Sequence, residues 1–96
     1  MQIVIRTYHG KGTRKLFDLL EAHQADVQAL MGSIKGLVSY TLARTTEGGF
    51  SVTICRDKHG IKKSVKLARE FIALHSPDTN LAAMHIFEGK VITHFK

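Results

Sequence analysis

Hydrophobic residues in this chain alternate with polar ones in four short stretches, and they recur every three or four positions in two longer ones. Alternation with a period of two is typical of β-strands, whereas a spacing of three and four is typical of amphipathic helices. The first pattern predicts strands over 2–8, 37–45, 50–56 and 90–95, the last with an alternative earlier start at 84–87. The second pattern predicts helices over 13–31 and 61–74.

A β-hairpin is predicted between the second and third strands. The tripeptide Glu47-Gly48-Gly49 separates two stretches rich in β-branched and aromatic residues, and glycines at such a point favour a tight turn. The resulting order, strand-helix-strand-strand-helix-strand, predicts an α+β fold of the ferredoxin-like βαββαβ type. In that sandwich two helices cover one face of a four-stranded antiparallel sheet. We expect the 96 residues to form a single domain, 1–96.

The alternation also assigns the strand side chains to two faces of the sheet. One face is predicted to be apolar and to lie under both helices, with Ile3, Ile5, Val38, Tyr40, Leu42, Val52 and Ile54. The other face is smaller and mixed, with Val4, Arg6, Tyr8, Ser39, Thr41, Thr53 and Cys55. A second copy of the chain can cover such a face, so we expect a homodimer. The alternative is a monomer whose antiparallel sheet is half solvated.

Composition narrows the function classes. The net charge is +6 at neutral pH, so a ligand or partner is expected to be anionic rather than cationic. The single cysteine, Cys55, excludes an internal disulfide and is typical of a reducing cytoplasm. The first residues lack the pattern of a signal peptide, and no apolar stretch approaches the roughly 20 residues that span a bilayer. We therefore expect a cytoplasmic protein with no membrane partner.

Three side chains are candidates for chemistry on the predicted apolar face. His23 belongs to the apolar stripe of the first helix, His75 continues that of the second, and Tyr40 lies in the second strand. Imidazole and phenol groups at the edge of an apolar cavity orient phenolic or quinone-like ligands and move their protons. The alternative, which we favour, is packing at the helix margins with the tyrosine hydroxyl near water.

Arg6 is a further candidate for ligand binding. On the mixed face it is expected near Tyr8 and His94, where it would hold a small anion at a dimer interface. The alternative is a set of hydrogen-bonded interface residues without a ligand. The facing of the last strand, and with it the position of His94, is left open.

No metal and no cofactor are expected. The six histidines and the single cysteine show none of the spacings typical of metal ligands. Nucleic-acid binding is considered because the second helix has a basic side, formed by Lys62, Lys63, Lys66 and Arg69. RNA-recognition domains share this element order, but they carry two or more stacking aromatics on the third strand, where this chain has only Phe50. A solvated helix face is the simpler interpretation.

A family resemblance rests on three segments: Gly36-Leu-Val-Ser-Tyr40, the hairpin after it, and Asp57-x-x-Gly60-x-x-x-Ser64. They resemble the antibiotic biosynthesis monooxygenase-like family of the dimeric α+β barrel superfamily, in particular its small stand-alone members without an assigned activity. The resemblance covers nearly the whole chain. It implies a homodimer with its helices outside and a ligand cavity between helices and sheet in each subunit.

Most of the residues that the family uses for catalysis have no counterpart in this chain. Haem-degrading relatives use an asparagine, a tryptophan and a histidine, and quinone-forming relatives also use tryptophan and asparagine. This chain has no tryptophan, its only asparagine is Asn80 in a loop, and His75 alone resembles the haem ligand.

Three functions follow from these observations. The first is a cofactor-independent monooxygenase acting on a small aromatic or polyketide-like substrate, with His23, Tyr40 and His75 as catalytic candidates and Arg6 as a further ligand contact. The second is a non-catalytic ligand-binding or interaction module that uses the same pocket. Nucleic-acid binding is the third. An enclosed cavity of several hundred cubic ångströms beside Tyr40 is expected for either of the first two.

Overall fold

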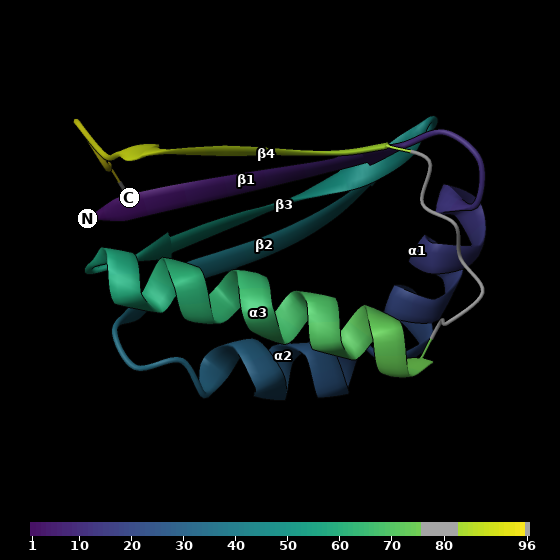
Figure 1. Cartoon of the computed structure of the whole chain (residues 1–96), viewed down its shortest axis with the longest axis horizontal. Helices are drawn as coiled ribbons and strands as arrows, with labels where there is room; N and C mark the ends of the chain where they lie inside the picture. Colours follow the sequence, from purple (N-terminus) through teal and green to yellow (C-terminus); the bar gives the residue numbers. More distant parts are fainter. Residues whose placement is uncertain (76–82, 96) are drawn as a thin grey trace.

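The structure, a computed structural model, describes residues 1–75 and 83–95. A four-stranded antiparallel sheet in the order β2-β3-β1-β4 carries three helices on one face (Figure 1). This arrangement confirms the predicted ferredoxin-like α+β fold. The elements are β1 Gln2–His9, α1 Thr13–Ala22, α2 Gln24–Gly32, β2 Leu37–Thr45, β3 Gly48–Cys55, α3 Lys58–His75 and β4 Ala83–Lys90.

The predicted hairpin joins β2 and β3 through a loop of two residues, Thr46 and Glu47, with Thr45 paired to Gly48. Two glycines follow the loop because other parts of the chain approach the strand closely. A Cβ atom on Gly48 would collide with the carbonyl oxygen of Tyr8 on β1, and one on Gly49 would collide with the ring of Phe17 on α1. The turn therefore fixes the hairpin and also lets β1 and α1 pack against its base.

The helices cover the opposite face of β1 from the one predicted. Val4, Arg6 and Tyr8 are buried beneath them, with 0%, 2% and 5% of their surface exposed. Ile3 and Ile5, which were predicted to be covered, are only partly buried on the other face. The prediction failed because both faces of β1 carry large apolar residues, so alternation alone does not say which one the helices cover.

The same inversion applies to β3. Ser51, Thr53 and Cys55 are buried under the helices, whereas Phe50 and Val52 lie on the other face and are partly buried. Small side chains on the covered face allow a helix to approach the strand closely. The helices thus pack on the face that the sequence pattern described as mixed.

On β2 the predicted facing of Tyr40 and Leu42 is correct, because both pack against the core under the helices. Val38 is an exception, with 39% of its surface exposed. A register irregularity between Leu37 and Ser39 interrupts the alternation at this point. Tyr40 and Arg6, which were predicted on opposite faces, therefore share one face.

The first predicted helix is two helices that meet at His23. This residue has φ −114° and ψ 30°, outside the helical region, and it ends α1 and precedes α2. Its Nδ1 atom lies 3.1 Å from Oδ2 of Asp26 in the first turn of α2. The molecule therefore has three helices where the periodicity predicted two, and α3 begins three residues earlier than predicted, at Lys58.

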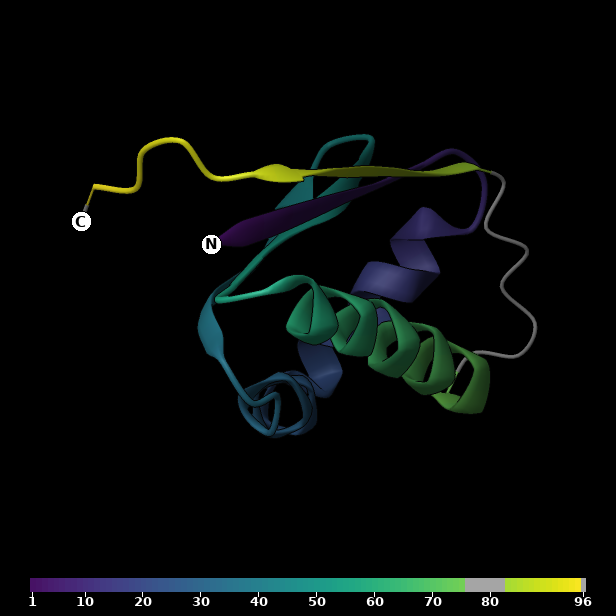
Figure 2. The same ribbon diagram turned by 60° about the vertical axis from the view of Figure 1, so that its left-hand side comes forward.

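The last strand follows the alternative earlier start. β4 ends at Lys90, and the predicted strand region beyond it is an extended tail that leads away from the molecule (Figure 2). Ile92 and Phe95 in this tail are 97% and 95% exposed. His94 is also exposed, so the predicted group of His94 with Arg6 and Tyr8 does not form.

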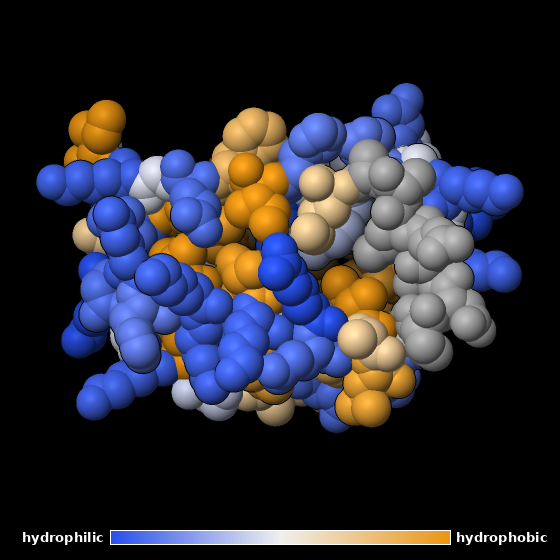
Figure 3. Space-filling model, in the orientation of Figure 1, coloured by the Kyte–Doolittle hydropathy of each residue, from blue (hydrophilic) through white to orange (hydrophobic). Residues whose placement is uncertain are grey.

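The sheet face without helices has an apolar centre, and we call it the open sheet face. The strand register places Ile5, Val52 and Phe87 together on it, with Ile3 and Phe50 as neighbours. Phe87 is 59% exposed. Hydrophilic side chains instead gather on the solvent side of α3 (Figure 3). The molecule thus has one polar helical side and one uncovered apolar side.

Candidate functional site

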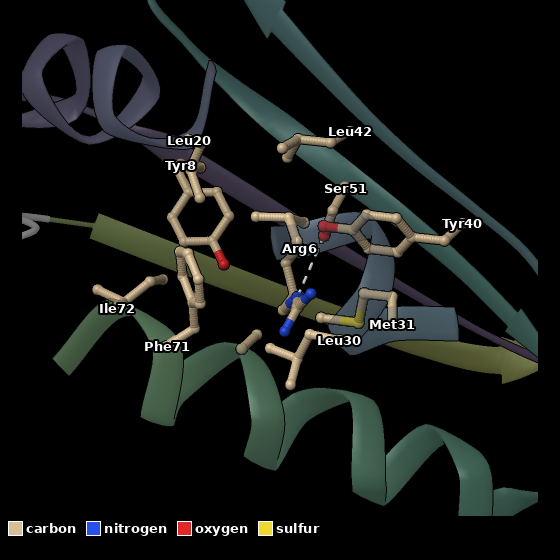
Figure 4. A pocket seen from close by; sticks show the side chains of 12 residues that line it. Arg6, Tyr8, Leu20, Leu30, Met31, Tyr40, Leu42, Ser51, Phe71 and Ile72 are labelled. Carbon is tan, nitrogen blue, oxygen red and sulfur yellow. Dashed lines mark hydrogen bonds between the residues drawn. The ribbon is translucent and has the colours of Figure 1, made fainter. Parts of the chain in front are cut away.

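A small internal space, which we call the Arg6 chamber, lies between the sheet and the helices (Figure 4). Its volume is about 20 Å³, roughly enough for one water-sized group. Strands β1, β2 and β3 supply its polar side chains, and all three helices supply apolar ones. The lining residues are Arg6, Tyr8, Leu20, Val27, Leu30, Met31, Tyr40, Leu42, Ser51, Ala68, Phe71 and Ile72.

Arg6 is the only residue with a full charge among the described residues that line this chamber. Its Nε atom donates a hydrogen bond to Oγ of Ser51 at 3.1 Å, and its Nη1 atom donates to the carbonyl oxygen of Ser64 at 3.5 Å. Within residues 1–75 and 83–95, no aspartate or glutamate forms an ion pair with it. A guanidinium that is 2% exposed therefore keeps a positive charge inside the protein with only neutral partners, which is energetically costly.

Two phenols flank this guanidinium. Tyr8 extends from the same strand as Arg6, Tyr40 comes from β2, and both hydroxyl groups are directed toward the Arg6 side chain (Figure 4). Burial raises the pKa of both phenols above the ordinary value, although the charge of Arg6 acts in the opposite direction on both. Both are therefore neutral near pH 7 and available as hydrogen-bond donors.

A larger half-open groove, the outer groove, adjoins the chamber. Its volume is about 430 Å³, which is in the usual range for sites that bind small organic molecules. The residues that line both spaces are Leu20, Val27, Tyr40 and Leu42, so the groove and the chamber adjoin at these side chains. The remaining lining residues are Phe17, Glu21, Gln24, Gln28 and Arg44. The enclosed cavity of several hundred cubic ångströms expected beside Tyr40 is thus replaced by a one-atom chamber and an open groove.

Solved structures with this architecture include proteins with bound ligands. The heme-degrader MhuD from Mycobacterium tuberculosis, with two hemes bound in its active site, has a TM-score of 0.69 and 15% identity over 100% of both chains. The ActVA-Orf6 monooxygenase of Streptomyces coelicolor, in complex with Nanaomycin D, has a TM-score of 0.68 and 15% identity over 99% of this chain and 90% of its own. A dimeric ferredoxin-like protein from an uncultured marine organism has a TM-score of 0.64 and 14% identity over 99% of this chain and 95% of its own.

This chain has the ferredoxin-like fold of these proteins. The resemblance to monooxygenase-like proteins of the dimeric α+β barrel type is thereby confirmed for the fold, at identities that carry over no residue role and no activity. No protein-family model matches the sequence, and no curated protein matches it.

The predicted site residues divide into two groups within this fold. Arg6 and Tyr40 lie together in the chamber. His23 and His75 do not line it; they form a separate cluster with Phe71, in which the two imidazole centroids are 4.9 Å apart and the His75 ring stacks on Phe71 at 4.2 Å. Phe71 is the side chain that both groups share.

The hydrogen bonds of the two histidines are local. Nδ1 of His75 lies 3.1 Å from the carbonyl oxygen of Phe71, one helical turn earlier. Nδ1 of His23 faces the carboxylate of Asp26 across the junction of α1 and α2. It is instead the ring contacts of His23 with Phe71 and His75 that join the end of α3 to the break between the other two helices.

Sequence reasoning missed Tyr8 as a ligand contact and Ser51 altogether. Tyr8 was grouped with Arg6, but on the face predicted to be outside the helices. Ser51 was treated as an ordinary strand residue, yet it is the hydroxyl that pairs with Arg6. The available signal was the Arg6-x-Tyr8 alternation on β1, whereas the pairing of β1 with β3, which places Ser51 opposite Arg6, is a tertiary property.

The remaining sequence candidates do not line the chamber. Lys62, Lys63, Lys66 and Arg69 are exposed along α3. No group of three potential metal ligands occurs within residues 1–75 and 83–95, and none of the helices in those ranges has the length and apolar character needed to cross a membrane. Asn80 lies outside the described residues.

Proposed function

We propose that this protein binds a small aromatic or polyketide-like ligand and oxidises it with molecular oxygen, without a metal or flavin. The observation that carries the proposal is the position of the outer groove, which has the volume for such a ligand and shares Tyr40 and Leu42 with the chamber of Arg6. The apolar body of the ligand lies in the groove, and its polar end is directed toward the chamber.

The residues provide orientation and charge in this scheme. Phe17, Leu20 and Val27 supply apolar contacts to the ligand body, Tyr40 donates a hydrogen bond to its oxygen, and Arg6 stabilises negative charge that develops there. A ligand methylene loses two hydrogen atoms and gains one oxygen atom, and the second oxygen atom of O2 leaves with those hydrogens as water. The ligand supplies the electrons.

A non-catalytic ligand-binding module is the second candidate, and a specific observation favours it. None of the described residues that line the chamber is a carboxylate or an imidazole, so a general base of the usual kind is not positioned there. We assign His23 and His75 to packing with Phe71 rather than to catalysis. In this alternative, the groove and Arg6 hold the ligand and do not change it.

We further propose that the protein is a homodimer in which two open sheet faces pack together. The support is the apolar character of that face, on which Ile5, Val52 and Phe87 lie side by side, and the dimeric state of one protein with the same fold. The contact would be isologous about a two-fold axis. The proposed setting is the cytoplasm, which suits the free, buried thiol of Cys55.

Oxygen consumption tests the catalytic proposal. The protein is incubated under air with a panel of phenols, naphthols and anthrones, and dissolved oxygen is recorded against a buffer blank. We expect uptake with at least one compound, reduced at least tenfold by Tyr40→Phe and unchanged by Lys63→Gln on the solvent side of α3. Binding by calorimetry without any uptake would contradict the oxygenase and support the non-catalytic module.

A further inference from the structure

We propose that the Arg6 chamber is an oxyanion site that takes the single ionised oxygen of a phenol or an enol. The inference rests on the ligand-binding part of the proposed function and not on its oxidation step. It names the class of ligand: a weak acid whose conjugate base carries its charge on one oxygen, with an apolar body that fits the outer groove.

The first argument is charge balance. Arg6 is almost completely buried and its two hydrogen-bond partners are neutral oxygens of Ser51 and Ser64. Arg69, on α3, adds a second positive charge near enough to act on Tyr8. No described lining residue brings a negative charge, so an incoming anion removes an electrostatic cost that a neutral ligand would leave in place.

The second argument is that the protein itself does not provide the anion. Tyr8 and Tyr40 are the acidic groups beside Arg6, and burial raises the pKa of both. They remain protonated near neutral pH and act as donors. A guanidinium and two phenol hydroxyls directed into one apolar space form the arrangement that stabilises an oxyanion.

The third argument is size. The chamber has about 20 Å³, which accommodates roughly one oxygen atom. A carboxylate or a phosphate brings two or more oxygens and does not fit without enlarging the space. A phenolate or enolate brings one oxygen, and its carbon skeleton extends into the outer groove past the side chains that line both spaces, which are Leu20, Val27, Tyr40 and Leu42.

The proton balance of binding follows directly. At a pH where the free ligand is protonated, the phenol or enol O–H bond breaks and its proton passes to the buffer, while the electron pair stays on the oxygen beside Arg6. Binding is therefore accompanied by proton release, and the apparent acidity of the bound ligand increases.

The test uses 4-nitrophenol, whose ionised form absorbs visible light, with 4-nitroanisole as a neutral analogue of similar shape. Calorimetry measures binding of each compound, and absorbance measures the ionised fraction of bound 4-nitrophenol below the pH at which it ionises in water. We expect 4-nitrophenol to bind at least tenfold more tightly than 4-nitroanisole and to be ionised when bound.

Variants separate the charge of Arg6 from its packing. Arg6→Gln is expected to weaken binding of 4-nitrophenolate at least tenfold and to abolish the excess ionisation, because a charged hydrogen bond is lost. Arg6→Lys keeps the charge and is expected to keep most of the ionisation. Arg14→Gln, at an exposed position on α1, is the matched control and should change neither. Circular dichroism verifies that each variant is folded.

The outcomes distinguish the two proposals. If 4-nitrophenol and 4-nitroanisole bind equally and the bound phenol is protonated, the oxyanion site is overturned, whereas the proposed binding of ligands in the outer groove is retained. An Arg6→Gln variant that is folded and still ionises the bound phenol also overturns it. If neither compound binds, both the proposed ligand-binding function of the groove and the proposed oxyanion site are contradicted.

Discussion

At the scale of single residues, Arg6 is the position where the proposed ligand binding and the stability of the free protein place opposite demands on the side chain. Its guanidinium is buried with Ser51 and Ser64 as partners and without a described carboxylate beside it. Nothing in packing alone requires a charge at this position, since a buried ion is often replaced by an apolar side chain of similar volume without loss of stability. We attribute its presence to the proposed ligand, which would supply the missing negative charge.

Replacing Arg6 by methionine is therefore expected to stabilise the free protein. The variant removes an uncompensated buried charge together with its two hydrogen bonds, and replacing buried charged groups by apolar side chains of similar volume is often neutral or stabilising by about 1–4 kcal/mol as a net effect. We expect a net increase of about 1 kcal/mol in the free energy of unfolding, measured in urea without ligand, together with loss of 4-nitrophenolate binding.

The control for this prediction is Arg14→Met on the exposed side of α1, which should change the free energy of unfolding by less than about 0.5 kcal/mol. A clear loss of stability in Arg6→Met, with Arg14→Met unchanged, would show that the guanidinium is satisfied by its protein partners and needs no ligand.

At the scale of elements, the position of α3 on the sheet is set by close contact with β3. Gly60 in its first turn faces Cys55, and a Cβ atom at this position would lie 2.9 Å from Cβ and 3.0 Å from Sγ of that cysteine. Its backbone N–H donates to the Asp57 carboxylate at 3.1 Å, which fixes the start of the helix. Helix α3 also carries Ser64, whose carbonyl oxygen accepts a hydrogen bond from Arg6, and Phe71, which lines the chamber. The contact of Gly60 with Cys55 therefore determines the position of both residues in the site.

Gly60→Ala is expected to separate the first turn of α3 from β3. Alanine favours the helix by up to about 1 kcal/mol relative to glycine, but the added methyl group has no room, and such overpacking costs about 1–3 kcal/mol. The net loss in the free energy of unfolding should be about 1 kcal/mol or more, measured by urea denaturation.

Gly32→Ala provides the matched comparison, because a Cβ atom at Gly32 in α2 meets nothing within 4 Å. That variant should be neutral or more stable by about 0.5–1 kcal/mol. Equal effects of the two substitutions would contradict the close packing of α3 on Cys55.

At the scale of the whole molecule, the sheet has two different apolar faces and helices for only one of them. The covered face holds the chamber, while the open sheet face displays Phe87 with 59% of its surface in contact with solvent. An uncovered apolar sheet face in a small protein is typically an interaction surface. A second copy covers it with identical chemistry, which is why we expect a two-fold dimer.

Val52→Lys on the open sheet face should convert the dimer to a monomer without unfolding it. The new ammonium group would lie in the apolar centre of the proposed interface, where an unpaired charge is unfavourable, whereas in the monomer it extends into water. Light scattering is expected to give about twice the 10.7 kDa chain mass for the original protein and the chain mass itself for the variant.

Thr46→Lys, in the exposed loop between β2 and β3, adds the same charge outside the interface and should remain dimeric. If the original protein has the mass of one chain at high concentration, the proposed pairing of sheet faces is wrong, while the chamber and the groove, which lie within one chain, are unaffected.

The sequence by itself determined the order of the strands and helical regions, the hairpin and the boundaries of β2, because periodicity and turn chemistry are local properties of the chain. It did not reveal the break that divides the first helical region into α1 and α2. It also identified Arg6 and Tyr40 as candidates. Only the tertiary structure decided which sheet face the helices cover, since both faces of β1 offer apolar side chains and the choice depends on how closely helices approach small residues such as Ser51 and Cys55. That choice placed Arg6 inside the protein beside Tyr40 and left the two histidine candidates, His23 and His75, to pack together behind Phe71.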